Sequence, residues 1–466
     1  MTQEMVHQKQ ESALSDAQTY AEKWLGIIRQ EKVSEELGKQ IIDESRQNFA
    51  EHFNRGWLGY RKSVTEAGDW AATEWTGSGA MFEDVLGRKY IDCLGGYGLM
   101  DLGWGHPEVV QAVMGQLKRT PMPSQELIDP LRGALAKLLA MITPGDIQYS
   151  FFAASGTEAI EGAVKLAKMY TKKPALISAV KGFHGKTMGS LSLMGKADYR
   201  IPPGILYGGP VYHVPYGDAH AVEQQLEICH TVGIVVAAVV MEPIQGEAGA
   251  IVPPDDFWPR IREATRKQDE LLIADEEQTG MGRTGKLWGV QHWDVEPDII
   301  SVAKSLGGGV MPISAFMSTE KIWSVMMDPN PFIHTTTTGG NPLACSAAIA
   351  AIRITLRERL WEQAAKKGEY FIAKLKELAA RYPGIFKSIT GKGLLIGMHF
   401  HNPEVGYQVA AGLFKRGVLV AGTLTSAHTI RIEPPLIIEL ETINEVLNRL
   451  EDTLSEISRN GWIETT

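Results

Sequence analysis

Residues 271–309 read LLIADEEQTGMGRTGKLWGVQHWDVEPDIISVAKSLGGG, and this stretch decides the fold. It contains two strand-like runs, 271–274 and 297–303, which lead directly into Asp275 and Lys304. Three consecutive glycines follow the lysine after two residues. Apolar runs that end in a charged residue near a glycine turn are typical of a parallel sheet, whose functional groups lie at the carboxyl ends of its strands. We therefore expect Asp275 and Lys304 at one edge of such a sheet.

The pairing of a lysine with an aspartate one strand away indicates a particular chemistry. A lysine is costly to bury without a function. In an apolar pocket, its amine becomes a nucleophile that forms a Schiff base with an aldehyde. A carboxylate nearby can hold a proton on a pyridine nitrogen. Lys304 and Asp275 together are what pyridoxal 5'-phosphate (PLP) requires, so they are the candidate catalytic residues.

Length, charge and cysteine content exclude several classes of protein. A chain of 466 residues favours one large and one smaller domain, and a net charge of −9 without a basic stripe argues against nucleic-acid binding. The three cysteines, Cys93, Cys229 and Cys345, are too far apart for a CxxC metal site or a disulfide framework. The polar start has no signal-peptide pattern, and the apolar run at 232–241 is too short to span a bilayer. We expect a soluble cytoplasmic protein without a metal site.

The order of expected elements predicts an α/β fold. From residue 149, strand-like runs alternate with amphipathic helical patterns, which indicates a mostly parallel sheet covered by helices. Helices are also expected over 13–55, with a start at Ser34, and over 107–143. Strands near 393–400 and 417–422 indicate a second, smaller α+β domain. The predicted division is an N-terminal helical extension (1–60), the N-terminal part of the small domain (61–100), a large cofactor-binding domain (101–342) and the C-terminal small domain (343–466).

Two short motifs could contact a cofactor. Ser155, Gly156 and Thr157 lie between an expected strand and an expected helix, where amides and hydroxyls form an anion site. The alternative is a plain helix cap. Phe183 and His184 follow another strand, and an aromatic ring there could stack on a cofactor, although a phenylalanine in such a place is more often part of the core.

Two further motifs could bind a dinucleotide or a substrate carboxylate. The run Gly280–Gly285 matches G-x-G-x-x-G, but it does not follow a strand directly and no clear helix follows it, so a Rossmann dinucleotide site is disfavoured. Arg431 lies in the extended run TIRIEPPL, where an arginine suits bidentate capture of a carboxylate, and Glu247 is its candidate partner. The alternative for Arg431 is an ordinary salt bridge on a surface strand.

Taken in order, these motifs resemble the class III (ω-amino acid) aminotransferases of PLP fold type I. The resemblance covers nearly the whole chain and is carried by SGTE, FHGK, EPIQGE, DEEQTGMGRTG, AKSLGGG, GGNP and IRIEPPL. Within that family the chain is most similar to the subgroup of bacterial putrescine aminotransferases. RKSVTEAGDW at 61–70, DCLGGYG, SQELIDPLR and the N-terminal helical extension carry this closer resemblance.

The resemblance implies roles for residues around the cofactor ring. Lys304 would bind PLP covalently, Asp275 would pair with the ring nitrogen and Gln278 would contact the phenolic oxygen. Phe183 would stack on the ring, with His184 beside it.

The resemblance also implies how the phosphate and the substrates are held. Ser155, Gly156 and Thr157 would hold the phosphate, and Thr337 would reach the phosphate of the neighbouring subunit, so that a homodimer shares its active sites. Glu247 would mask Arg431 for the amine donor and release it for the carboxylate of the acceptor. Pairing of dimers into tetramers stays open.

Three positions depart from the family pattern. Ala154 stands where relatives have Asn, and Thr338 stands where they have an aromatic residue. Glu277 stands where the family places Val or Ile against the cofactor ring. A carboxylate there is costly to bury unless it is neutralised or solvated, so we expect it to loosen cofactor packing.

The resemblance favours a terminal diamine, putrescine and also cadaverine, as the amine donor. The acceptor would be 2-oxoglutarate or pyruvate. Tyr97, in the run GGYG, offers an aromatic rather than a second cation, which suits a donor without a carboxylate. The rival donors are ornithine, acetylornithine and 4-aminobutyrate. A decarboxylase or aminomutase on the same fold, a non-catalytic PLP-binding protein and an NAD-dependent oxidoreductase are the further alternatives.

Overall fold

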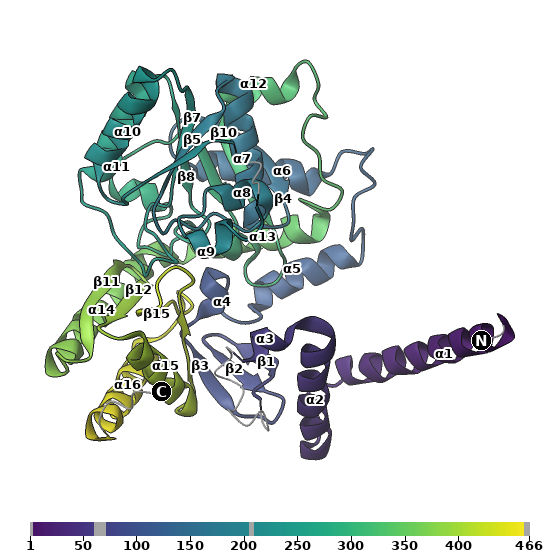
Figure 1. Cartoon of the computed structure of the whole chain (residues 1–466). Helices are drawn as coiled ribbons and strands as arrows, with labels where there is room; N and C mark the ends of the chain where they lie inside the picture. The colour runs from purple at the N-terminus through teal and green to yellow at the C-terminus, as the bar shows by residue number, and fades with distance from the viewer. Residues whose placement is uncertain (1–2, 60–70, 205–208, 461–466) are drawn as a thin grey trace. The chain divides into compact units, whose positions relative to one another are not determined.

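The computed structural model describes residues 3–59, 71–204 and 209–460 (Figure 1). The stretch RKSVTEAGDW, on which part of the closer resemblance rests, lies outside the described residues. The chain forms two compact units: one comprises Met1–Gly77 with Phe82–Tyr90, and the other comprises Ser78–Met81 with Ile91–Thr466. The domain boundaries expected at 60, 100 and 342 are not tested by this division and stay predictions.

The first unit is mainly helical. Ser34 caps its second helix as predicted, because its side chain accepts a hydrogen bond from the Leu37 amide at 3.2 Å. A small core of Ile27, Ile41, Ile42 and Val85 holds the unit together. Its elements are α1 (Gln3–Ile28), α2 (Glu35–Asn48), the π-helix η1 (Phe49–Asn54), α3 (Arg55–Leu58) and most of the strands β1 (Glu74–Ser78), β2 (Met81–Asp84) and β3 (Lys89–Asp92).

The second unit is built on a seven-stranded sheet, which confirms the predicted α/β fold. All neighbouring strands pair in parallel except β10, which is antiparallel to both of its neighbours. In spatial order the strands are β4 (Ile147–Ala153), β10 (Ser314–Thr319), β9 (Ile299–Val302), β8 (Leu271–Asp275), β7 (Val236–Met241), β5 (Ala175–Ala179) and β6 (Val211–Val214).

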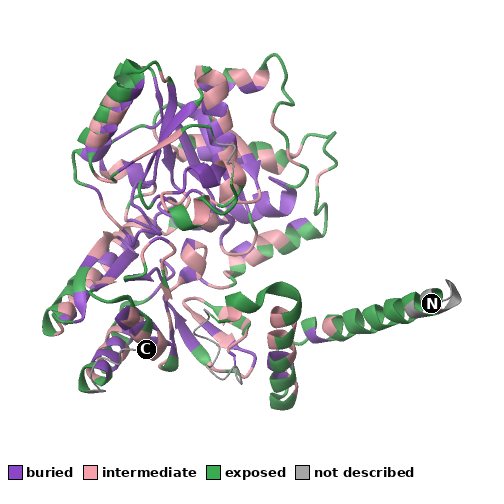
Figure 2. Cartoon of the chain, in the orientation of Figure 1, coloured by how far each residue is buried: buried purple, intermediate pink, exposed green. Residues whose placement is uncertain are grey.

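Helices cover both faces of this sheet, whose inner strands β5, β7, β8 and β9 are fully buried (Figure 2). Successive strand residues point to opposite faces, so Val239 and Ala274 join one core cluster while Ala238 and Ile273 join the other. This double burial explains the continuous apolar runs in the sequence. One face packs on α7 (Gly156–Thr171) and α12 (Glu320–Met327), and the other packs on α6 (Pro130–Ile142), α10 (Ala219–Thr231), α11 (Phe257–Lys267) and α13 (Pro342–Arg357).

The sheet places the two candidate catalytic residues next to each other. Strands β8 and β9 are parallel neighbours, with Asp275 opposite Ser301. Asp275 is the last residue of β8, and Lys304 follows β9 at the start of the short 3₁₀-helix η3 (Lys304–Gly307). Their adjacency at the carboxyl edge of the sheet is therefore confirmed.

A second, antiparallel sheet and three long helices follow in the chain. They enclose a separate apolar core that includes Phe371, Ile396, Phe400 and Ile432. The sheet order is β11 (Phe386–Lys392), β12 (Leu395–Phe400), β15 (Thr429–Ile432) and β14 (Ala421–Gly422), and the helices are α14 (Leu360–Arg381), α15 (Pro403–Lys415) and α16 (Leu440–Asn460). The two-residue strand β13 (Val418–Leu419) pairs instead with Ile91 and Asp92.

One helical expectation was too long. The stretch 107–143 forms two helices, α5 (Pro107–Leu117) and α6, because the segment between them contains Pro121 and Pro123. None of the helices in the described ranges has the length and apolar character needed to cross a bilayer. The remaining short elements are α4 (Gly95–Gly98), α8 (Met188–Ser192), α9 (Ala197–Arg200) and the 3₁₀-helix η2 (Gly289–His292).

Candidate active site

A cavity of about 440 Å³, here called the cofactor cavity, opens at the carboxyl edge of the central sheet. Leu99, Ala303 and Ile313 provide an apolar part of its wall. It also brings together most of the residues for which the sequence predicted cofactor contacts. These are Ser155, Gly156, Thr157, Phe183, His184, Asp275 and Lys304.

Asp275 is held in place by a buried histidine. Its Oδ2 lies 2.6 Å from His184 Nδ1, and both side chains are at most 2% exposed. Burial opposes a charged imidazole, but the hydrogen bond and the charge of Asp275 outweigh it and raise the pKa of His184. The histidine on Oδ2 and the Glu277 amide, which donates to Oδ1 at 3.1 Å, together fix the orientation of the Asp275 carboxyl.

A second buried carboxyl, Glu242, holds the loop that carries the aromatic residue. It accepts hydrogen bonds from the Phe183 amide at 3.0 Å and from the Gly246 amide at 2.9 Å. Burial raises the pKa of Glu242 to about 7, although the nearby His184 opposes this shift. The role of Glu242 could not be read from the sequence, because one of the two amides that it binds, that of Phe183, lies 59 residues earlier in the chain.

The start of α7 provides an anion cradle. Its N-cap residue, Ser155, makes no capping hydrogen bond, because its hydroxyl donates to Glu158 Oε2 at 2.7 Å instead. The first amides of this 16-residue helix therefore keep their capacity to bind an anion. Gly185 also approaches closely: a Cβ there would collide with Thr157, and its φ of 119° favours glycine. A phosphate group fits this cradle better than a bulky side chain would.

Glu277 is the residue that fits a PLP site least well. Its carboxyl lies against Gly156, in the space that a Cβ would occupy, and its Oε1 has no hydrogen-bond partner among the described residues. Burial and the charge of Asp275 raise its pKa to about 8, with Lys304 acting in the opposite direction. Glu277 therefore borders the cradle largely in its neutral form at neutral pH.

The donor set as a whole fits PLP. It combines an amine at Lys304, a carboxylate at Asp275, an aromatic ring at Phe183 and the amides at the start of α7. Lys304 itself has a φ of 43°, a conformation uncommon for residues other than glycine and often found at functional sites. Among the described residues, no cluster of His, Cys, Asp or Glu has a metal-binding arrangement.

Arg431 occupies a separate cage that is fully buried. Its Nη1 lies 2.9 Å from Glu247 Oε1, and its Nε lies 3.0 Å from Glu433 Oε2. The guanidinium carbon also lies 5.3 Å from the centroid of the Tyr97 ring. Burial opposes the charge of Arg431, but the two carboxylates outweigh it and raise its pKa. The expected pairing of Arg431 with Glu247 is present, and the alternative of a surface salt bridge is wrong.

The two carboxylates of this cage differ in their surroundings. Burial opposes ionisation of Glu247, but Arg431 and the Leu424 amide, 2.8 Å from Oε2, outweigh it and hold its pKa below the usual range. Burial instead raises the pKa of Glu433, although Arg431 opposes the shift, and Glu433 Oε1 has no partner among the described residues. Glu433 was not among the predicted site residues. Its position two residues after Arg431 on an extended run, which puts both on one face, was the signal in the sequence.

Two predicted contacts lie outside the cofactor cavity. Gln278 joins the cage: its Oε1 accepts from Arg431 at 3.2 Å, and its Nε2 donates to Glu433 and to the Tyr97 carbonyl. Thr337 is exposed, and its carbonyl accepts a hydrogen bond from Gln125. The roles predicted for Gln278 at the ring and for Thr337 at a neighbouring phosphate stay predictions.

The GMGRTG run, 280–285, stabilises the fold through a buried arginine. Gly280–Gly285 forms turns, and Arg283 is fully buried, where it pairs with Asp101 and donates to the Leu394 carbonyl at 3.0 Å. The Arg283 carbonyl accepts the Leu394 amide in return, at 3.0 Å. The run thus ties β8 to the antiparallel sheet, which agrees with its rejection as a dinucleotide fingerprint.

The chain is similar to known proteins over most of its length. The chain matches the sequence model of the class-III aminotransferases over residues 69–454. It is 49% identical over 414 residues to the putrescine aminotransferase of Pectobacterium atrosepticum, and the match covers 88% of each chain.

Solved structures with the same fold include two transaminases. A transaminase from the marine bacterium Virgibacillus superposes with a TM-score of 0.83 at 26% identity, covering 90% of this chain and 99% of the other. The ornithine aminotransferase of Toxoplasma gondii superposes with a TM-score of 0.77 at 30% identity, covering 84% of this chain and 90% of the other. That structure has PLP at partial occupancy in its active site.

Proposed function

The chain belongs to the class III aminotransferases, which are PLP-dependent, and we propose that it transfers an amino group from a terminal diamine to a 2-oxo acid. The donor would be putrescine, and also cadaverine, and the product would be the corresponding amino-aldehyde. The acceptor would be 2-oxoglutarate or pyruvate. The 49% identity to a putrescine aminotransferase supports this choice of donor.

The residues of the cofactor cavity have distinct tasks in this proposal. Bound PLP supplies an electron sink for the reaction. Lys304 holds the cofactor, and its amine then moves the proton at the donor carbon as general base and acid. Asp275, oriented by His184, would pair with the ring nitrogen. Phe183 would cover the ring, and Ser155, Gly156 and Thr157 would hold the phosphate.

The observation that carries the choice of donor is the cage around Arg431. A diamine has no carboxylate, so an unpaired buried arginine would repel its cationic end. Arg431 is instead held between Glu247 and Glu433, and the three groups together have a net charge of −1 when both carboxyls are ionised. This charge favours an ammonium group nearby, and the Tyr97 ring adds a cation-binding face.

The second half-reaction requires Arg431 to be free of its pairing with Glu247. A 2-oxo acid brings a carboxylate, which Arg431 can bind only after Glu247 has turned away. Arg431 Nη2 has no hydrogen-bond partner among the described residues, so this donor remains for such a ligand. We therefore assign Glu247 and Arg431 as a switch between donor and acceptor.

Aminotransferases for ornithine, acetylornithine or 4-aminobutyrate form the rival group. Their structures share the fold, as the Toxoplasma gondii enzyme illustrates. Their donors, however, carry a carboxylate that calls for a second cationic anchor, and beside Arg431 the chain offers the Tyr97 ring instead.

Single half-reactions distinguish these donors. The purified PLP form would be mixed with putrescine, ornithine or 4-aminobutyrate, without any oxo acid, and its conversion to pyridoxamine phosphate would be followed by absorbance. We expect fast conversion with putrescine. Fast conversion with an amino acid but not with putrescine would contradict the diamine proposal while leaving the aminotransferase itself intact.

The homodimer with shared active sites is also part of the proposal, together with a cytoplasmic location, which the three free cysteines support. Co-expression of Lys304→Ala subunits with Thr337→Ala subunits tests the sharing. A mixed dimer would contain one site with both native residues, so activity should exceed that of either variant alone. Activity no higher than that of Thr337→Ala alone would contradict a shared site.

A further inference from the structure

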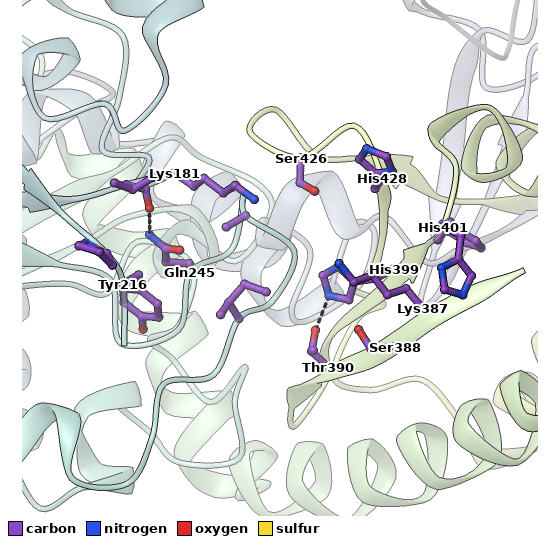
Figure 3. A pocket seen from close by; sticks show the side chains of 15 residues that line it. Lys181, Tyr216, Gln245, Lys387, Ser388, Thr390, His399, His401, Ser426 and His428 are labelled. Atoms are coloured by element: carbon purple, nitrogen blue, oxygen red, sulfur yellow. Dashed lines mark hydrogen bonds between the residues drawn. The ribbon is translucent and has the colours of Figure 1, made fainter. Parts of the chain in front are cut away.

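A second cavity, of about 680 Å³ and here called the basic cleft, lies between the loop after β5 and the β11–β12 hairpin. Figure 3 shows its lining side chains, with Lys181 and Gln245 on one side and Lys387, His399 and His401 on the other. It shares none of its lining residues with the cofactor cavity. The proposed aminotransfer assigns no role to it.

The charged side chains that line the basic cleft are all basic. Its ionisable side chains include two lysines and three histidines, and none of its lining residues within the described ranges is a carboxylate. Ser388, Thr390 and Ser426 add hydroxyl groups. In a chain with a net charge of −9, a concave surface without acidic residues stands out. The basic residues are Lys181, Lys387, His399, His401 and His428.

His399 is fixed in the wall of this cleft. Its Nε2 lies 2.8 Å from Thr390 Oγ1, and its Nδ1 lies 3.0 Å from Thr429 Oγ1. Burial lowers the pKa of His399, and the charges of Lys181 and Lys387 lower it further. The two lysines come from opposite walls of the cleft (Figure 3).

Lys181 is kept in an unfavourable backbone conformation. Its φ of 63° is in the left-handed region, where glycine would avoid a steric cost. Its amide donates to the Gly195 carbonyl at 2.9 Å, and its carbonyl accepts from Thr425 Oγ1 at 3.2 Å. The fold thus pins the backbone and directs a cationic side chain to the cleft (Figure 3).

We propose that the basic cleft binds a small polyanion, a molecule with several negatively charged oxygens grouped within a few ångströms. Lysines on both walls can pair with such a ligand, and the Ser388 hydroxyl can donate to it. The cleft has the size of a small-molecule site. A polycarboxylate and a polyphosphate share this chemistry, and they are the two sources that the test separates.

Calorimetry on the PLP-loaded enzyme tests the proposal with pyrophosphate and citrate at constant ionic strength. We expect saturable binding of at least one of them with one site per chain. The double variant Lys181→Gln, Lys387→Gln should weaken that binding by about tenfold or more. Tighter binding of pyrophosphate would identify a phosphate ligand, and tighter binding of citrate a polycarboxylate.

A charge-matched control gives the test its specificity. Lys374→Gln with Lys415→Gln removes the same charge from α14 and α15, outside the cleft, and should leave binding unchanged. An equal loss in both double variants, or no saturable binding by the native enzyme, would overturn the proposal.

The pKa of His399 reports ligand binding independently of the measured dissociation constant. Nuclear magnetic resonance of labelled histidines should show the pKa of His399 rising when pyrophosphate or citrate binds, because the anion favours the imidazolium form. His292, which lies outside the cleft, should not change. Saturable binding that left the pKa of His399 unaltered would place the ligand elsewhere and reject the basic cleft as its site.

Discussion

The end of β8 and the cage around Arg431 both bury carboxyl groups, but they compensate them differently. At β8, Asp275 has a histidine partner, whereas Glu277, two residues later, has an unpartnered oxygen and a pKa raised to about 8 by burial. In the cage, Glu247 and Glu433 share one arginine. At β8 a bound proton neutralises the carboxyl that has no partner, whereas in the cage Arg431 compensates one of two carboxyls, and Glu433 Oε1 also lacks a partner among the described residues.

This difference indicates which ligand each region is prepared for. A compensated cluster can exchange one ion pair for another, as a switch between two substrates requires. A carboxyl without a partner beside an anion cradle crowds a bound phosphate, and it also repels the phosphate once the pH rises enough to ionise it. We infer that the cage determines which substrate binds, while the end of β8 limits how tightly the cofactor binds.

Replacing Lys304 should have the largest effect. Lys304→Ala removes both the covalent link to PLP and the proton-transferring amine, so turnover should fall by about 10⁴-fold. Mass spectrometry after borohydride reduction would show no PLP on the chain. Lys374→Ala, on exposed α14, should behave as the native enzyme does. Covalent PLP in Lys304→Ala would mean that another lysine holds the cofactor.

Changing Arg431 should separate the two half-reactions. Arg431→Lys keeps the charge but loses the planar fork that binds a carboxylate at two points. The rate with 2-oxoglutarate should fall by about 10²-fold, equivalent to roughly 3 kcal/mol, while the rate with putrescine changes much less. Stopped-flow absorbance measures each half-reaction alone. Equal losses in both would argue against a carboxylate-binding role.

Replacing Glu277, at the end of β8, should strengthen the binding of PLP. In Glu277→Val the carboxyl beside Gly156 is gone, and PLP affinity should rise by about tenfold, or roughly 1.4 kcal/mol. The isosteric Glu277→Gln distinguishes loss of charge from loss of crowding. Equilibrium dialysis of the apoenzyme with PLP gives the dissociation constants. Unchanged or weaker affinity in the valine variant would refute the inferred strain.

The same residue should also make the stability of the chain depend on pH. The pKa of Glu277 is raised on folding, from 4.5 to about 8, so the folded chain binds more protons than the unfolded chain between these values. Stability from this group is therefore present at low pH and is lost as the pH rises through about 8. Relative to Glu277→Gln, the melting temperature of the native apoenzyme should decline from about pH 5 to about pH 9. Parallel curves for the two proteins would show that Glu277 is not protonated on folding.

Much of the fold could be predicted from the sequence because its strands are buried on both faces. Continuous apolar runs revealed β5, β7 and β8 and placed Asp275 and Lys304 at one edge. The antiparallel direction of β10 could not be predicted, because a short apolar run does not encode the direction of its neighbours. The break between α5 and α6 was visible in Pro121 and Pro123, but helical periodicity on both sides obscured it.

The site was predictable where a motif is local and unpredictable where partners are distant in sequence. The anion cradle at Gly156 lies within one strand–helix connection. Gln278 and Glu433, by contrast, are 155 residues apart and meet only in the folded chain, so their shared contact with Arg431 could not be inferred. Glu277 was recognised as unusual from its side-chain type, while its position against Gly156 required the structure.

One measurement tests the division between the two regions directly. The PLP dissociation constant, and the ratio of the putrescine to the 2-oxoglutarate half-reaction rates, would be determined for Glu277→Val and Glu247→Gln side by side. We predict that Glu277→Val changes the constant and preserves the ratio. Glu247→Gln should change the ratio, by slowing the diamine half-reaction, and preserve the constant. A Glu247→Gln variant with an unaltered ratio, or a Glu277→Val variant in which only the ratio moves, would contradict the division.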